Sequence, residues 1–264
     1  MTGNAGLLNE ITRILCAGGI EDAPLEAKWI LEDAADEAAA RKIAERRAAH
    51  EPLQYLLGKW EFYGLPVYVG EGVLIPRADT ETLVDAVLER KHRLPESPAA
   101  VDLCTGSGCI ALALKRHLPD LMMTGIDKSK MALTFAERNA AENGLDVQWF
   151  CDDVTAPELT FDALDLIVCN PPYLTAGDME NLQTEVAFEP QEALYGGEDG
   201  LDFYRRITAV WRDSLRCGGM IAYEVGCTQA EAVSEILAEN GFAQIEIIRD
   251  LNGNERVVLG CRKS

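Results

Sequence analysis

Apolar residues recur at two different spacings along the chain, and the change of spacing divides it. In residues 1–58, Leu7, Leu8, Ile11, Ile14 and Leu15 lie on one face of a helix. Pro24 is suited to open a second helix, and Pro52 to end a third or open the next. The third helix is expected over residues 37–49. This segment therefore predicts a small all-helical unit.

Residues 59–98 connect this unit to the rest of the chain. Residues 60–69 are aromatic and β-branched and predict a β-hairpin, with Gly64 and Pro66 as turn residues. A helix is expected from Asp79 to His92, capped by Asp79 or Thr80. Residues 94–98 are expected to be a linker.

From residue 99 onward, strand and helix patterns alternate. The expected strands cover residues 100–103, 122–126, 147–150, 164–169, 220–225, 243–248 and 256–261, and the expected helices cover residues 109–117, 129–143, 201–215 and 228–240. Alternating βα units predict an α/β fold with a mostly parallel sheet and helices on both faces. No helix separates the last two strands, so an antiparallel strand is expected at or near the edge.

Composition narrows the class of protein. The 264 residues are 48% hydrophobic and 26% charged, as in ordinary globular chains. With 24 Lys and Arg against 44 Asp and Glu, the net charge of −20 disfavours nonspecific binding to nucleic acid. The sequence has no long apolar run and no N-terminal signal. We therefore expect a cytoplasmic location and no membrane partner.

Cysteine and histidine spacing excludes several chemistries. The eight cysteines form no CxxC pair, and most are expected to be buried free thiols in a reducing compartment. The three histidines have no spacing typical of a metal site or of a nucleophile–base pair. Zinc catalysis and Ser-His hydrolysis are therefore disfavoured, and no metal is expected.

A glycine-containing turn follows the first strand of the alternating region. The segment from Asp102 through Cys104, Thr105, Gly106 and Ser107 to Gly108 allows a ligand to approach the backbone closely. The alternative is a tight turn without a ligand. The loop is not GxGxxG and lacks the Lys of a phosphate-binding loop, so a ligand without phosphate is favoured.

Acidic residues after the next two strands suggest which ligand this is. Asp127 could accept hydrogen bonds from ribose hydroxyls, although it could instead be a helix N-cap. Asp153 could accept from an adenine amine while Val154 packs on the ring, but the adjacent Asp152 competes for this role. Asp102 could serve an amino-acid tail. S-adenosylmethionine has all three parts, and S-adenosylhomocysteine would be its product.

The segment Asn170-Pro171-Pro172-Tyr173 follows an apolar strand and is the most informative part of the sequence. The Asn170 side-chain oxygen and the Pro171 carbonyl can both accept from a planar NH₂ group, and Tyr173 can stack on a flat substrate group. Two such acceptors would assist methyl transfer to a weakly nucleophilic amide or aniline nitrogen. The alternative is a proline-rich turn without catalytic function.

Together these residues resemble the HemK/PrmC-type methyltransferases, which methylate the glutamine of the Gly-Gly-Gln motif in peptide chain release factors. The resemblance covers nearly the whole chain. It rests on residues 51–58, 73–77, 80–84, 102–108, 127, 170–173, 188–190, 193–194, 196–197, 199–201, 218–219, 224, 226, 229, 250, 253 and 255–257.

The resemblance implies a class I, Rossmann-like methyltransferase domain with a seven-stranded sheet. It implies three parts: a helical substrate-recognition domain at 1–58, a hairpin linker at 59–78 and a methyltransferase domain at 79–264. Cofactor contacts are then expected from Asp102, residues 104–108, Asp127, residues 153–154 and Asn170. Catalysis is expected from Asn170, Pro171 and Tyr173, and residues 170–173 would bind the substrate amide.

The chain departs from the family at two places. Cys104 stands where the family usually has glycine, and Ala78-Asp79 replaces the usual Pro-Glu. Neither change removes a group that the expected chemistry needs.

Three functions remain open from the sequence. The first is a protein-glutamine methyltransferase whose partners are release factors and which acts as a monomer. The second is an adenine-amino methyltransferase for DNA or RNA, since the residue 170–173 chemistry also suits an exocyclic amine. The third is a non-catalytic cofactor-binding or scaffold protein. The acidic net charge disfavours the second, and the intact residue 170–173 segment disfavours the third.

Overall fold

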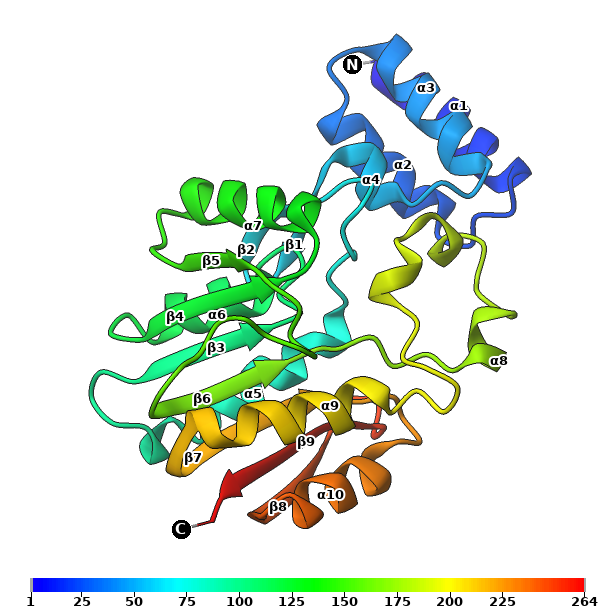
Figure 1. The fold of residues 1–264 in the computed structure, drawn as a ribbon. Helices are drawn as coiled ribbons and strands as arrows, with labels where there is room; N and C mark the ends of the chain where they lie inside the picture. Colours follow the sequence, from blue (N-terminus) through cyan, green and yellow to red (C-terminus); the bar gives the residue numbers. More distant parts are fainter. Residues whose placement is uncertain (1, 264) are drawn as a thin grey trace.

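A computed structural model describes residues 2–263 of the chain (Figure 1). Its N-terminal part is helical, as predicted. Ile11, Leu15 and Ile30 are fully buried there in a core of their own. The helices of this unit are α1 (Thr2–Ala17), α2 (Ala23–Asp33), α3 (Glu37–Ala48) and α4 (Leu53–Leu57).

The predicted hairpin is present, but Pro66 is not a turn residue. Strand β1 (Lys59–Phe62) pairs antiparallel with β2 (Leu65–Tyr68), and Pro66 lies inside β2 opposite Glu61. The turn consists of Tyr63 and Gly64, both with positive φ, as a two-residue hairpin loop requires. Proline is tolerated in β2 because this two-stranded sheet consists of edge strands only.

The hairpin packs against the large α/β unit. Phe62, Leu65 and Val67 belong to the same buried cluster as residues of the main sheet and helices. The Asn139 side chain on α7 accepts from the Tyr68 amide and donates to the Tyr68 carbonyl, at 2.6 and 3.1 Å. The hairpin is therefore built into the wall of the α/β unit.

A seven-stranded sheet forms the centre of the α/β unit, with the order β5-β4-β3-β6-β7-β9-β8. Strand β9 runs antiparallel to both β7 and β8, and it is next to the edge strand β8, so an antiparallel strand lies near the edge, as predicted. The strands are β3 (Ala99–Leu103), β4 (Met122–Asp127), β5 (Gln148–Cys151), β6 (Leu164–Cys169), β7 (Leu215–Glu224), β8 (Phe242–Arg249) and β9 (Glu255–Arg262).

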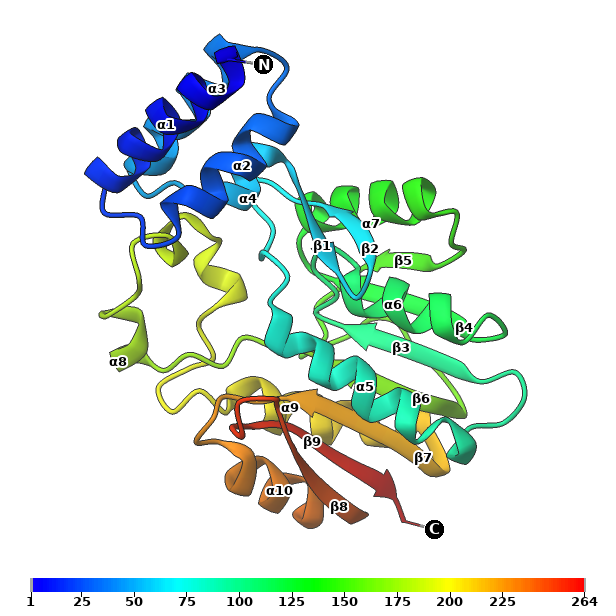
Figure 2. The same cartoon turned by 180° about the vertical axis from the view of Figure 1, so that it is seen from behind.

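Helices cover both faces of this sheet (Figures 1 and 2). Residues of α5, α6 and α7 pack into one apolar core, and residues of α9 and α10 pack into a second core on the other face. The bounds are α5 (Glu81–Glu89), α6 (Cys109–His117), α7 (Lys130–Asn143), α9 (Asp202–Trp211) and α10 (Ala230–Glu239).

The start of α5 differs from the prediction. A 3₁₀ turn, Ala78–Thr80, precedes the helix, and a second, Lys91–Arg93, follows it. Neither expected cap forms: Thr80 holds the N-cap position without a side-chain cap bond, and Asp79 pairs with Arg256 at 3.1 Å. Both side chains are thus available for contacts outside their own helix.

A long connection, here called the β6–α9 loop (residues 170–201), lies between the helical unit and the sheet (Figure 1). It holds the short helix α8 (Ala176–Met179) and two 3₁₀ turns, Val186–Phe188 and Gln191–Ala193. Leu174 and Tyr195 bridge its two arms. This loop carries the Asn170–Tyr173 segment away from the sheet and back to α9.

The cysteine prediction is only partly correct. All eight thiols are free, but only Cys109, Cys169 and Cys261 are buried and Cys104 is half-buried. The remaining four are exposed: Cys16, Cys151, Cys217 and Cys227. Across residues 2–263, no helix is both long and apolar enough to cross a membrane.

Candidate active site

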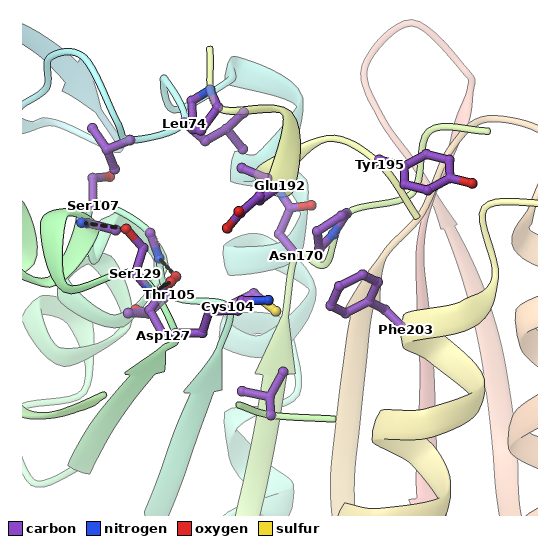
Figure 3. A pocket seen from close by; sticks show the side chains of 18 of the residues that line it. Leu74, Cys104, Thr105, Ser107, Asp127, Ser129, Asn170, Glu192, Tyr195 and Phe203 are labelled. Carbon is purple, nitrogen blue, oxygen red and sulfur yellow. Dashed lines mark hydrogen bonds between the residues drawn. The ribbon is translucent and has the colours of Figure 1, made fainter. Parts of the chain in front are cut away.

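A cavity of about 370 Å³ opens at the carboxyl ends of β3, β4 and β6 (Figure 3). Open α/β sheets bind ligands at this edge, and the volume is in the range of small-molecule sites. Predicted residues from four loops line it: Cys104, Thr105, Gly106, Ser107, Asp127, Asp153, Val154, Asn170 and Pro172. Asp102, Gly108, Pro171 and Tyr173 were also predicted as site residues but do not line it.

The loop after β3 presents its backbone to the cavity. Gly106 has φ +57°, and a β-carbon added there would meet nothing within 4 Å, so this stretch faces open space. Cys104 also has φ +57°, a conformation that glycine adopts freely and other residues adopt at a cost. The Thr105 amide donates to Ile126 at 3.0 Å and anchors the loop to β4.

Asp127 joins two loops across the cavity floor. One carboxylate oxygen accepts from the Gly106 amide and the other from the Ser129 amide, both at 2.8 Å. Ser129 caps α7 through the Ala132 amide, so Asp127 is not the N-cap. Burial raises the pKa of Asp127, and these amides oppose that shift by stabilising the carboxylate. The carboxylate is thus held in place at the cavity surface.

Asp102 lies beneath the loop and is fully buried. One of its oxygens accepts from the Thr105 hydroxyl at 2.5 Å, and the other has no hydrogen-bond partner. Burial raises the pKa of Asp102 to about 7. The structure therefore places this carboxyl behind the loop backbone, where it holds Thr105.

The two neighbouring aspartates after β5 have different positions. Asp153 lines the cavity and accepts from the Thr155 amide and hydroxyl. Asp152 instead accepts from the amides of Glu158 and Leu159 and does not line the cavity. The geometry thus favours Asp153 over Asp152. Val154, next to it, is buried against the cavity wall.

Asn170 directly follows β6 and points into the cavity above Cys104 (Figure 3). Its amide nitrogen donates to the Thr80 hydroxyl oxygen at 3.4 Å. Because the NH₂ group is engaged there, the side-chain oxygen is the atom left to accept from a ligand. The acceptor role predicted for Asn170 would use this oxygen.

Tyr173 is held from behind. The Gln229 side chain donates to the Tyr173 carbonyl at 2.9 Å and accepts from the Gly226 amide at 3.1 Å. Gly200 packs so closely that an added β-carbon would lie 2.3 Å from the Tyr173 carbonyl oxygen. These contacts position the backbone of the proline segment from the side away from the cavity.

One wall of the cavity consists of residues that the sequence did not predict as site residues. Residues 72–77, here called the wall segment, run along the cavity and are fixed at both ends of their length. The Tyr55 hydroxyl donates to the Val73 carbonyl at 2.6 Å. The buried Glu189 accepts from the Ile75 amide at 2.9 Å and pairs with Arg77. The Phe188-Glu189-Pro190 motif was the available sequence signal.

A second cavity of about 720 Å³ lies on the other side of the wall segment. Helical-unit residues, among them Trp29 and His50, line it together with the β6–α9 loop. Ile75 and Arg77 line both cavities, so the two spaces share a wall.

An ion-pair cluster closes one side of this second cavity. Arg47 on α3 is buried and pairs with Glu26 at 2.7 Å and with Glu185 of the β6–α9 loop at 3.0 Å. His50 also contacts Glu185, at 3.0 Å. Burial raises the pKa of Glu185, but His50 and Arg47 outweigh it and lower the pKa to about 2. The helical unit and the loop are therefore joined by charge.

Comparison with known proteins identifies the family. Residues 79–197 match the family described as "Methyltransferase small domain". The release factor glutamine methyltransferase of Geobacter sulfurreducens is 41% identical, covering 93% of this chain and 92% of that protein. The one from Moorella thermoacetica is 40% identical, covering 97% of each.

A solved structure supports the fold. A methyltransferase from Pyrococcus furiosus superposes with a TM-score of 0.58 at 15% identity, covering 77% of this chain and 91% of that one. The sheet and its helices are those of the class I methyltransferases. With this fold and relatives similar over almost their full length, the chain belongs to the release factor glutamine methyltransferase family.

Proposed function

We propose that the protein transfers a methyl group from S-adenosylmethionine to the side-chain amide nitrogen of the glutamine in the Gly-Gly-Gln motif of release factors, and so modulates translation termination. The observation that carries the proposal is the orientation of Asn170. Its NH₂ group is bound by Thr80, which leaves its oxygen as an acceptor in the cavity. A primary amide is the kind of group that such an acceptor holds.

The cavity fits the cofactor by its donor set. The open backbone at Gly106 and the carboxylate of Asp127 suit the amino-acid tail and the ribose, and Asp153 with Val154 suits adenine. When bound, S-adenosylmethionine supplies a methyl group on a positively charged sulfur.

The protein's own contribution is position and electrostatics. The Asn170 oxygen would accept one N–H of the glutamine amide in the cavity. The carbonyl of the next residue, Pro171, which is not among the lining residues, would accept the other and so hold the nitrogen toward the cofactor. The two acceptors favour the positive charge that develops on that nitrogen as the N–C bond forms and the carbon–sulfur bond breaks. The nitrogen then loses one of its two protons to give the neutral methylamide, and S-adenosylhomocysteine is released. Because both N–H bonds are directed, most of the barrier reduction comes from orientation. Pro172 and Tyr173 would then shape the space around the side chain.

We propose that the helical unit recognises the protein substrate. It lines the second cavity together with the β6–α9 loop, and the wall segment separates that cavity from the first. A release factor docked there could pass its glutamine along the wall segment to Asn170. In this proposal residues 1–58 recognise the substrate, residues 59–78 are the linker and residues 79–264 carry out methyl transfer. The hairpin within the linker packs as part of the methyltransferase domain.

Mass spectrometry tests the proposal directly. The protein is incubated with S-adenosylmethionine and either a release factor or duplex DNA, and the products are digested and sequenced. We expect a mass increase of one methylene on the Gly-Gly-Gln glutamine and none on DNA. A release factor whose glutamine is replaced by asparagine is the control and should stay unmodified. Methylated adenine with an unmodified release factor would instead support the adenine-amino alternative.

A further inference from the structure

Asn170 lies beside a buried carboxyl group. Cys169 pairs with Tyr223 in the parallel β6 and β7 register, so Asn170 and Glu224 are the next residues along neighbouring strands. Val168 and Ala222, two positions before each, pack in the core that contains α5. Since side chains alternate along strands, Asn170 and Glu224 project to this same face. Thr80, immediately before α5, contacts Asn170 there.

Glu224 is unusual in its surroundings. It is 1% exposed, and its Oε2 atom has no hydrogen-bond partner. Arg256 is close enough to influence it but directs its ion pairs to Asp79 at 3.1 Å and Asp250 at 3.5 Å. The Thr80 hydroxyl stabilises the charged form of the Glu224 carboxyl. A buried carboxyl this incompletely satisfied calls for an explanation other than stability.

We propose that Thr80 and Glu224 are positioning residues that orient the Asn170 amide for methyl transfer, an inference that rests on the proposed function. The Glu224 carboxylate accepts the Thr80 hydroxyl proton. The Thr80 oxygen, its proton thereby directed away, accepts from the Asn170 NH₂ group. The Asn170 oxygen must then face the cavity. A chain of hydrogen bonds in one direction also polarises each member and strengthens its acceptor end.

Protonation of Glu224 would reverse this chain. A protonated carboxyl donates to Thr80, whose hydroxyl proton then points to Asn170, and the amide turns its NH₂ group toward the cavity. Burial raises the pKa of Glu224 to about 7, with Thr80 and Arg256 opposing the shift. The other ionisable groups that interact with this carboxyl are Arg77 and Asp79 before α5, Cys109 on α6, Tyr173 after β6 and Tyr204 on α9.

The first test removes the Thr80 hydroxyl. Thr80→Val keeps the shape but leaves the Asn170 amide free to rotate, and misorientation of a reacting group costs on the order of ten- to a hundred-fold in rate. We expect that loss in kcat with unchanged affinity for S-adenosylmethionine, and recovery in Thr80→Ser. Thr208→Val is the matched control, since it also removes a buried, hydrogen-bonded hydroxyl, on the opposite face. Equal kcat in Thr80→Val and the parent would overturn the inference.

The second test uses pH. In the parent, kcat should rise as pH increases through about 7, the region in which Glu224 loses its proton. Glu224→Gln offers a permanent neutral acceptor, so we expect it to stay active and to lose this limb of the profile. A purely structural role would lower folding stability without moving the limb. A parent profile without the limb, or an unchanged limb in Glu224→Gln, would contradict the role assigned to Glu224.

Activity of the parent protein separates the proposed function from the positioning role. If the parent does not methylate a release factor at any pH, the proposed function is wrong. If the parent methylates it but Thr80→Val does so equally fast, only the positioning role is wrong. Circular dichroism and thermal unfolding of each variant show whether a loss of rate comes from a loss of fold.

Discussion

At the scale of single residues, the site depends on atoms whose partners the structure specifies. Asn170 is the clearest case, because its two polar atoms have separate tasks: the nitrogen binds Thr80 and the oxygen faces the cavity. Replacing Asn170 by alanine removes both of these polar atoms and adds no charge.

Asn170→Ala should therefore lower kcat by about 10²–10³, the usual effect of deleting one preorganised polar contact from an active site. Single-turnover kinetics at saturating cofactor isolate the transfer step. Asn181→Ala, in the same loop but outside both cavities, is the control. A transfer rate within a factor of about three of the parent would assign the acceptor role to another residue.

Cys104 permits a test of backbone strain. Its φ of +57° costs an L-residue about 1–2 kcal/mol, and glycine avoids this cost. Cys104→Gly should keep activity and cofactor affinity. Cys104→Val should unfold at a lower temperature than Cys104→Gly, because a β-branched side chain adopts positive φ at a greater cost. Thermal unfolding and calorimetry with S-adenosylmethionine measure the two effects. Equal unfolding temperatures for the two variants would show that strain at this position is negligible.

Residue types in the site could be predicted from local motifs, but their partners could not. Gly106 and Asn170 follow strands and Asp127 ends one, so their gathering at one sheet edge follows from parallel topology. The contact of Thr80 with Asn170 spans 90 positions, and that of Glu189 with Ile75 spans 114. No periodicity reports such contacts. Asp102 shows the converse, because its motif is regular but packing turned it away from the cavity.

At the scale of elements, six of the seven strands were predicted to within one residue at each end, because strands in such sheets are apolar runs bounded by turns. The exception is β7, which begins at Leu215, five residues before the expected start and inside the helix expected over residues 201–215. The ends of helices were less accurate. Asp79 was an expected cap but pairs with Arg256 instead, since a charged partner from β9 competes with the local amides. Pro66 was expected in a turn because the sequence does not show that β2 pairs on one side only, which is the setting in which a strand tolerates proline.

The β6–α9 loop is held to the helical unit by charge, and this makes its attachment pH-dependent. The folded pKa of Glu185, about 2, is below its ordinary value of 4.5. A carboxyl group whose pKa is lowered by folding stabilises the folded state at pH values above its ordinary pKa. That stability is lost as pH falls from about 4.5 toward 2. The group is about one-third exposed, so solvent screening reduces the effect.

When pH is lowered from roughly 5 to 3.5, the free energy of unfolding should therefore fall less in Glu185→Gln than in the parent. Denaturant unfolding at each pH measures the difference. Glu239→Gln, an exposed substitution at the end of α10, should follow the parent. Parallel curves for Glu185→Gln and the parent would mean that the Arg47–Glu185–His50 contacts contribute nothing to folding.

At the scale of the whole molecule, the boundary that matters for folding lies before the hairpin. Phe62, Leu65 and Val67 complete the core that α5, α6 and α7 share, whereas α1 to α4 have a core of their own. A chain that begins at Lys59 keeps every buried residue of the first core and loses only the partly buried Tyr55, which packs against it. A chain that begins at Val73 loses four buried apolar side chains, the three named above and Val69, together with the Tyr68–Asn139 hydrogen bonds.

We expect the shorter of these two chains to be less stable by several kcal/mol, since each buried large side chain contributes about 1.5–3 kcal/mol. The Lys59 chain should fold and bind S-adenosylmethionine, yet methylate an intact release factor poorly, because remote contacts position the reacting group. Unfolding, calorimetry and product analysis give the three readouts. Full activity of the Lys59 chain on the intact factor would remove the recognition role from residues 1–58.

The wall segment has a thermodynamic consequence, because Ile75 and Arg77 each face both cavities. A ligand that displaces this segment from one side changes the space available on the other. Free energy is a state function, so the factor by which a docked release factor changes cofactor affinity must equal the factor by which the cofactor changes release factor affinity. Glu189 fixes the segment to the loop, and Glu189→Gln should therefore alter both factors equally, as two titrations in opposite order would measure.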